Sequence, residues 1–173
     1  MKYIGTLVMV IVVYFIIGNV VATNNLIPED AIRIRVIANS DSEYDQQIKY
    51  KVKDSIQVKI FNLLKNVKGS ENARKVIKHN LENIKMDVSN TLLSENYNLD
   101  FEVNYGKNYF PEKKYKGITY KEGYYESLVI TLGEGKGENW WCVLFPPLCL
   151  VEAESSNETE YTTFVKELID KYL

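Results

Sequence analysis

The stretch Asn139–Leu150 constrains the fold more than any other part of the chain. It reads Asn-Trp-Trp-Cys-Val-Leu-Phe-Pro-Pro-Leu-Cys-Leu and holds both tryptophans and both cysteines of the protein. An apolar strand of this kind has to be buried on both faces or to cover another surface. Alternation predicts one face with Trp141, Val143 and Phe145, and another with Trp140, Cys142 and Leu144. We therefore expect one face in the core and the other covered by the chain or available to a partner.

The first 22 residues have the organisation of a secretory signal peptide. Lys2 precedes an almost wholly apolar run at Tyr3–Ile17, and small or modest residues at Val20 and Ala22 permit cleavage after Ala22. The alternative is an uncleaved membrane anchor, because residues 3–22 just reach the roughly 20 that a spanning helix needs. In both cases the positive end stays in the cytoplasm and the remainder is exported.

The rest of the chain is predicted to form one domain. Its 173 residues, 46% hydrophobic and 25% charged, suit a globular fold that needs no metal or disulfide to hold its core. The net charge of -2 excludes the strong positive field of a nucleic-acid-binding protein. We expect a linker at residues 23–30, a single α+β domain at 31–150, and a loop with a C-terminal helix at 151–173.

Hydrophobic periodicity predicts the elements of that domain. Alternation of apolar and polar residues predicts strands at Ala31–Ala38, Leu99–Tyr105, Gly123–Leu132 and Asn139–Phe145. Apolar residues at helical spacing predict helices near Glu43–Lys65, Glu71–Leu93 and Glu160–Leu173, the first capped by Ser42 or Asp41. A short loop makes the first two helices antiparallel neighbours. The expected fold is an antiparallel sheet of about four strands packed on a helical hairpin.

No pattern in the sequence predicts a catalytic, cofactor or metal site. Asp41, Glu43 and Asp45 match the first ligands of a calcium loop, but the glycine and the bidentate glutamate of such a loop are missing. His79, the only histidine, lies on a polar helix face without ligands at metal spacing. The glycine-rich run 133–137 precedes a strand rather than a helix, which favours a hairpin turn over a phosphate-binding loop.

The two cysteines leave two structures open. Export permits a Cys142–Cys149 disulfide. Seven residues of extended chain span about 23 Å, however, whereas a disulfide needs Cα atoms within about 7 Å. The bond therefore requires the chain to reverse at Pro146 and Pro147, and two buried thiols are the favoured alternative.

Three blocks of sequence resemble the stage II sporulation protein R family. The first block is Ile32–Ser42 with Asp45-Gln46 and Lys53-Asp54; the middle block comprises Tyr105-Gly106, Phe110–Lys113 and Gly123–Glu126; the closing block is Gly137–Cys149. The chain departs from the family at Tyr120–Gly123, where a Tyr-Pro-Ala-Gly turn is usual, and at Leu150, which replaces a usual phenylalanine.

The resemblance implies a signalling role in endospore formation and no enzymatic activity or cofactor. Members of the family are made in the forespore and exported into the space between the forespore and mother-cell membranes. The implied partner is a membrane-embedded aspartic protease of the mother-cell membrane. Once triggered, that protease cleaves the precursor of the mother-cell sigma factor, sigma E.

We expect the partner to be bound mainly by the closing block, because interface energy concentrates in buried aromatic residues. The predicted contact residues are Trp140, Trp141, Phe145, Pro146 and Leu148, with Arg33, Arg35, Asn39 and Asp41 as polar companions. Two other functions remain open at this point. One is an exported hydrolase or thiol enzyme that uses Cys142, Asp41, Asp45 or His79. The other is a cell-wall carbohydrate binder that stacks sugars on the tryptophans.

Overall fold

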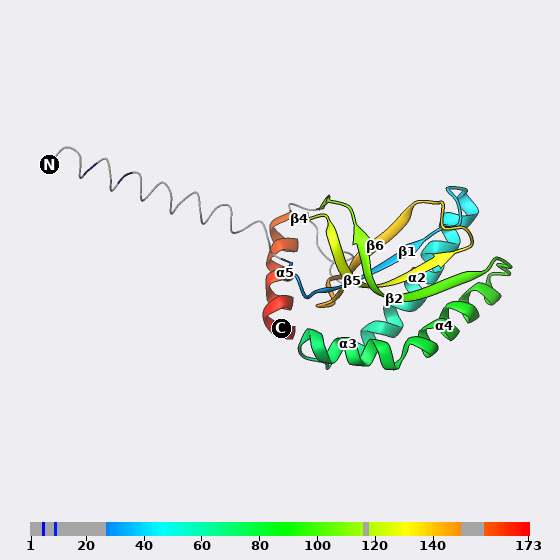
Figure 1. Cartoon of the computed structure of the whole chain (residues 1–173), viewed down its shortest axis with the longest axis horizontal. Coiled ribbons are helices and arrows are strands. Elements are labelled where there is room, and N and C mark those ends of the chain that lie inside the picture. The colour runs from blue at the N-terminus through cyan, green and yellow to red at the C-terminus, as the bar shows by residue number, and fades with distance from the viewer. Residues whose placement is uncertain (1–4, 6–8, 10–26, 116–117, 150–157) are drawn as a thin grey trace.

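The fold is α+β, with three helices on one face of a four-stranded sheet (Figure 1). The computed structural model describes residues 5, 9, 27–115, 118–149 and 158–173. The sheet has the order β2-β5-β1-β6, from β1 (Ile32–Ile37), β2 (Phe101–Phe110), β5 (Gly123–Leu132) and β6 (Asn139–Phe145). The helices on its face are α2 (Glu43–Leu64), α3 (Ser70–His79) and α4 (Leu81–Ser94). A small second sheet pairs β3 (Lys113–Tyr115) with β4 (Ile118–Tyr120), and α5 (Glu158–Tyr172) lies at one end of the main sheet.

The predicted signal peptide or anchor, residues 1–22, lies outside the described residues except for Gly5 and Met9. Cleavage after Ala22 therefore stays a prediction. In the part of the chain that the structure describes, no helix is both long enough and apolar enough to cross a membrane.

The main sheet is mixed, so the expectation of an antiparallel sheet was wrong for one pair of strands. β1 runs parallel to β5 and antiparallel to β6, while β2 is antiparallel to β5. Parallel neighbours need a crossover of a dozen or more residues. The three helices, β2, β3 and β4 separate β1 from β5 in the sequence and provide that crossover.

The helix-covered face holds the larger hydrophobic core. Side chains that alternate along the strands, such as Ile34, Val36 and Leu128, meet the apolar stripe of α2, which includes Val52 and Ile56. Each fully buried aliphatic side chain of this size contributes about 1.5–3 kcal/mol of transfer free energy. Burial of these periodic positions fixes which face of the sheet the helices cover.

The ends of the helices follow from local chemistry. Ser42 caps α2, because its side-chain oxygen accepts the Asp45 backbone N–H at 3.2 Å, as predicted. The predicted helix at 71–93 is interrupted at Asn80, which has φ -99° and ψ 10° and donates its side-chain amide to the Val76 carbonyl at 2.9 Å. Such side-chain bonds compete with helix propagation. The expected helical hairpin is therefore a group of three helices.

A bulge near the end of β6 changes the face of Phe145. Ile32 pairs with Phe145 while Arg33 pairs with Val143, so Leu144 is an extra residue on β6. Phe145 consequently joins the helix-side core, and its ring contacts the ring of Tyr172 at 5.8 Å. Its predicted place on the same face as Trp141 was wrong, because alternation holds only for an unbroken ladder.

The opposite, outer face of the sheet curls over on itself. Phe110 ends β2 and Trp141 lies on β6, with β5 and β1 between them, yet their ring centroids are 5.7 Å apart. β4 adds to this contact through Tyr120, whose ring lies 5.2 Å from that of Trp141. A strongly coiled sheet accounts for the closure. A smaller core forms beneath it from Ala31, Ile118, Tyr120, Val143, Leu148 and Val165.

Candidate functional site

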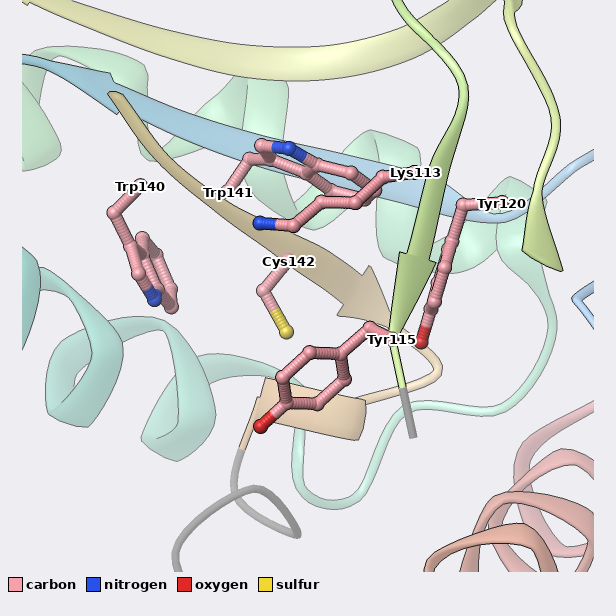
Figure 2. A pocket seen from close by; sticks show the side chains of 6 residues that line it. All are labelled: Lys113, Tyr115, Tyr120, Trp140, Trp141 and Cys142. Carbon is pink, nitrogen blue, oxygen red and sulfur yellow. The ribbon is translucent and has the colours of Figure 1, made fainter. Parts of the chain in front are cut away.

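Trp140 and Trp141 are the centre of the candidate site. Both are half-buried and lie on β6, which is the last strand of the sheet among the described residues. Figure 2 shows their indole rings on opposite sides of the strand. Trp140 packs against the helix-side core, and Trp141 packs against the smaller core on the outer face. Each indole therefore keeps a free part at the edge of the sheet.

A cavity of about 220 Å³ opens between β6 and the β3–β4 sheet. Its lining consists of Lys113, Tyr115, Tyr120, Trp140, Trp141 and Cys142 (Figure 2). Pockets for drug-sized ligands measure about 300–1,000 Å³, so this one suits one or two side chains of a protein partner. The lining is aromatic except for Cys142 and Lys113, whose Nζ lies 5.2 Å from the centroid of the Trp141 ring.

Beneath Trp141, Arg33 is buried among aromatic rings. Only 2% of its surface is exposed, and its guanidinium carbon lies 3.3 Å from the ring centroid of Tyr125, 5.2 Å from that of Phe110 and 5.6 Å from that of Trp141. Stacking on these rings stabilises the cation. Burial nevertheless lowers the pKa of Arg33 from its ordinary value.

Arg35 lies two residues further along the same face of β1. Its guanidinium carbon is 5.1 Å from the Phe110 ring, and Nη1 donates to the Tyr109 carbonyl at 3.4 Å. Nε and Nη1 of Arg33 and Nε of Arg35 are buried without a hydrogen-bond acceptor among the described residues. No described carboxylate forms an ion pair with either arginine. The outer face therefore holds two cations without a counter-ion from the described residues.

The end of β1 carries a second polar cluster, built around Asp45. Its carboxylate accepts hydrogen bonds from Asn39 Nδ2 at 2.9 Å, from the Ser40 hydroxyl, and from the Tyr97 hydroxyl at 3.1 Å. Burial alone raises the pKa of Asp45, but the bonds from Ser40, Asn39 and Tyr97 outweigh it and hold that pKa below its ordinary value. Burial and the bond to Asp45 raise the pKa of Tyr97. The cluster is a buried, ionised carboxylate held by donors of its own chain.

The glycine-rich run 133–137 packs against this cluster. The predicted hairpin was wrong, because β1 lies between β5 and β6 and the run carries the chain across the end of β1. Asn39 Oδ1 accepts the Glu134 N–H at 2.9 Å, and Asp41 Oδ1 accepts the Glu138 N–H at 2.6 Å. A Cβ on Gly137 would lie 2.2 Å from the Ser40 carbonyl oxygen, which explains the glycine there.

The structure divides the predicted contact residues into three groups. Trp140 and Trp141 keep accessible surface, Arg33 lies against the Trp141 ring, and Arg35 is the cross-strand partner of Trp141. Phe145, Pro146 and Leu148 are buried, so in the free protein they pack behind the tryptophans. Asn39 and Asp41 lie at the end of β1 and bind their own chain.

Sequence reasoning missed four residues near the tryptophans. Lys113, Tyr115 and Tyr120 belong to β3 and β4, and Lys53 of α2 places Nζ 5.6 Å from the Trp140 ring. The aromatic character of residues 109–120 was the only signal for the first three. Nothing in the sequence places Lys53 of α2 beside β6, because that contact depends on the packing of two distant elements.

Both cysteines are buried thiols that form no disulfide with each other, as predicted. The chain does reverse after β6, and the Cys149 thiol donates to the Val143 carbonyl at 3.0 Å, while Cys142 Sγ lies 3.7 Å from the same oxygen. His79 is exposed on α3. Among the described residues no three His, Cys, Asp or Glu side chains are grouped as metal ligands.

Comparison with known proteins gives this site a context. Residues 28–155 match the family described as Stage II sporulation protein R (spore_II_R). The chain is 41% identical over 151 residues to Stage II sporulation protein R of Bacillus subtilis (strain 168), an alignment covering 86% of this chain and 67% of that protein. No solved structure matches the chain. The chain belongs to the stage II sporulation protein R family, and its role lies in sporulation.

Proposed function

We propose that this chain is an exported signalling protein that binds and activates a membrane-embedded aspartic protease of the mother-cell membrane. Activation leads to cleavage of the sigma-E precursor in the mother cell. Family membership and the signal-like N-terminus support this proposal. The protein acts in the space between the two membranes, either released by cleavage after Ala22 or held by its N-terminal segment.

The half-exposed tryptophan pair on the edge strand is the observation that carries the proposal. Aromatic residues with free surface, set around a cavity the size of a side chain, are the usual anchors of a protein interface. Arg33 packs against the Trp141 ring, Arg35 lies opposite Trp141 on β1, and both provide positive charge. Phe145, Pro146 and Leu148 pack behind the surface, and Asn39 and Asp41 hold the crossing that leads into β6.

The orientation of the two rings argues against carbohydrate binding. A sugar ring stacks on a flat aromatic platform, whereas Trp140 and Trp141 project to opposite sides of β6 (Figure 2). A pull-down of the purified protein on peptidoglycan checks this. Binding that is lost in the double tryptophan variant would favour a cell-wall function over the proposed one.

The main test replaces Trp140 and Trp141 by alanine, singly and together, in sporulating cells that carry no other copy of the gene. We expect the double variant to slow processing of the sigma-E precursor at least about tenfold, because truncating interface anchors costs about 2 kcal/mol or more. Immunoblots of precursor and product measure the rate.

Tyr124→Ala is the matched control, since Tyr124 is an aromatic residue with 73% of its surface exposed and no contact with the cavity. Circular dichroism of each purified variant separates loss of binding from loss of folding. Normal processing by a folded double variant would rule out this surface as the docking site.

A further inference from the structure

The ladder between β1 and β6 determines which backbone groups of β6 point outward. The Ala38 N–H donates to the Glu138 carbonyl at 3.5 Å, so the backbone carbonyl of Glu138 points toward β1. Adjacent residues of an antiparallel strand turn their N–H and C=O groups to opposite edges. The backbone N–H and C=O groups of Trp140 and Cys142 therefore point toward β1. Those of Asn139, Trp141 and Val143 point outward.

Part of this outward edge is already used by the chain. The Val143 carbonyl accepts the Cys149 thiol, which agrees with the assigned direction. For Asn139 and Trp141, no described residue forms a backbone bond with the outward groups, and no described strand pairs with this edge. Such an edge is a template for another strand. The open length is short, about three residues at the start of β6.

The cavity lies directly beside this open edge. A strand laid along Asn139–Trp141 would project alternate side chains to the two sides of the sheet. The lining of Trp140, Trp141 and Tyr120 favours an apolar side chain. Lys113 adds a cation to the lining and forms no ion pair with a described acidic residue.

Charge around the tryptophans indicates the character of the incoming strand. The chain as a whole has a net charge of -2, yet Arg33, Lys53 and Lys113 each lie within 6 Å of an indole centroid, and Arg35 is the cross-strand partner of Trp141. Of these four, only Lys53 has a described counter-ion, its neighbour Asp54. The site is therefore complementary to an acidic segment.

We infer that an extended segment of the protease partner adds to the outer edge of β6 as a further strand. Its backbone bonds to Asn139 and Trp141, an apolar side chain enters the cavity, and an aspartate or glutamate side chain pairs with Lys113. Strand addition of this kind takes affinity from main-chain bonds and specificity from side-chain pockets. The inference rests on the proposed function and specifies how the tryptophan surface would bind.

The first test is amide hydrogen exchange of the free, full-length protein, measured by nuclear magnetic resonance. The Trp141 N–H should exchange at least about tenfold faster than those of Trp140 and Cys142, which face β1. Equal protection of all three would show that the edge is already occupied and would overturn the inference.

The second test measures binding to the detergent-solubilised protease with a matched pair at position 139. Asn139→Pro removes one outward N–H at the first residue of an edge strand, a position where proline is tolerated. Asn139→Ala retains that N–H. We expect the proline variant to bind about three- to tenfold more weakly than the alanine variant, as for loss of one hydrogen bond.

The third test reverses the charge of the lysine that lines the cavity. Lys113→Glu should weaken binding about tenfold, whereas Lys75→Glu, an exposed site on α3, should leave it unchanged. If neither Asn139→Pro nor Lys113→Glu weakens binding while Trp141→Ala does, strand addition is wrong and the tryptophan surface stands. If Trp141→Ala also leaves binding and processing unchanged, the proposed function itself fails at this surface.

Discussion

The two polar clusters along β1 differ in how far the chain satisfies their hydrogen bonds. At the end of the strand, Asp45 is buried with hydrogen bonds from Asn39, Ser40 and Tyr97. On the outer face of the same strand, Arg33 and Arg35 are packed against rings and keep buried N–H groups without acceptors among the described residues. Donors of the chain itself satisfy the Asp45 carboxylate, whereas the two arginines keep buried N–H groups without a described acceptor.

This difference separates residues that hold the fold from residues suited to binding. A fully satisfied buried network stabilises one arrangement of the chain. A buried cation without a counter-ion costs stability unless something else compensates it. Substitutions in the first cluster should therefore act on folding, and substitutions in the second on signalling.

The largest effect is expected from Asp45→Ala. It leaves three donors without their acceptor in a buried site, and bonds to a charged group contribute about 1.5–3 kcal/mol each. We expect the free energy of unfolding to fall by about 4 kcal/mol in urea titrations. Asp54→Ala is the control, because among the described residues that exposed carboxylate pairs only with Lys53, and its loss should cost about 0.5 kcal/mol or less. Equal losses of unfolding free energy in the two variants would show that the Asp45 cluster stabilises the fold no more than an exposed ion pair does.

A smaller loss is expected from Gly137→Ala. The added methyl group would meet the Ser40 carbonyl oxygen at 2.2 Å, so the crossing over β1 has to shift. Overpacking of this kind costs about 1–3 kcal/mol. Gly106→Ala is the matched control, since its methyl group would make only a 3.6 Å contact with Asn104. Thermal unfolding compares the two, and an unchanged melting temperature for Gly137→Ala would show that the crossing is loosely packed.

Acid should reduce the contribution of the Asp45 cluster to the stability of the fold. The pKa of Asp45 is lower in the folded protein than in the unfolded chain, where it is about 3.9. Its contribution is therefore fully present above that value and is lost as the pH falls through the folded pKa. The stability difference between the wild type and Asp45→Asn should shrink below about pH 4, as measured by urea titration at several pH values. A difference that stays constant from neutral pH to pH 3 would contradict the assigned role.

The smallest change in stability is expected from Arg33→Met. Loss of the ring contacts removes about 0.5–2 kcal/mol, but removal of an unpaired buried cation offsets it, so the net change should stay within about 1 kcal/mol. Processing of the sigma-E precursor should nevertheless slow several-fold in sporulating cells, because the positive charge beneath Trp141 is gone.

Arg74→Met provides the contrast for Arg33. Arg74 joins α3 to β5 through Glu126, with Nε 2.7 Å from Oε2, and its loss leaves a partly buried carboxylate unpaired. This variant should lose about 2–3 kcal/mol and retain signalling once folded. Equal destabilisation by Arg33→Met would place Arg33 with the residues that hold the fold.

Much of the local structure was predictable because it depends on neighbouring residues. The strand at Gly123–Leu132, the α2 helix and the cap at Ser42 follow from alternation, helical spacing and a side-chain acceptor. Errors arose where one residue changes the pattern. Asn80 interrupts the second helix, and Leu144 shifts the register of β6, so Phe145 changes face.

The sequence indicated only some of the residues of the candidate site. The tryptophans stand out by residue type, and the arginines by their alternation on β1. The missing half comes from β3, β4 and α2, which approach β6 only in the folded chain. For Asn39 and Asp41, predicted as partner contacts, the sequence does not reveal the bonds to the backbone of residues 134 and 138, because these bonds span more than ninety positions.

The sequence by itself determined the long strands, the positions of most helical segments, most of their apolar faces, and to which family the chain belongs. These properties reside in short-range patterns and in residue identity. Only the tertiary structure decided that β1 lies between β5 and β6, that Arg33 is buried among rings, and that one edge of β6 is left open among the described residues. Such features depend on which distant segments pack together, because strand order and counter-ion pairing are properties of the whole fold.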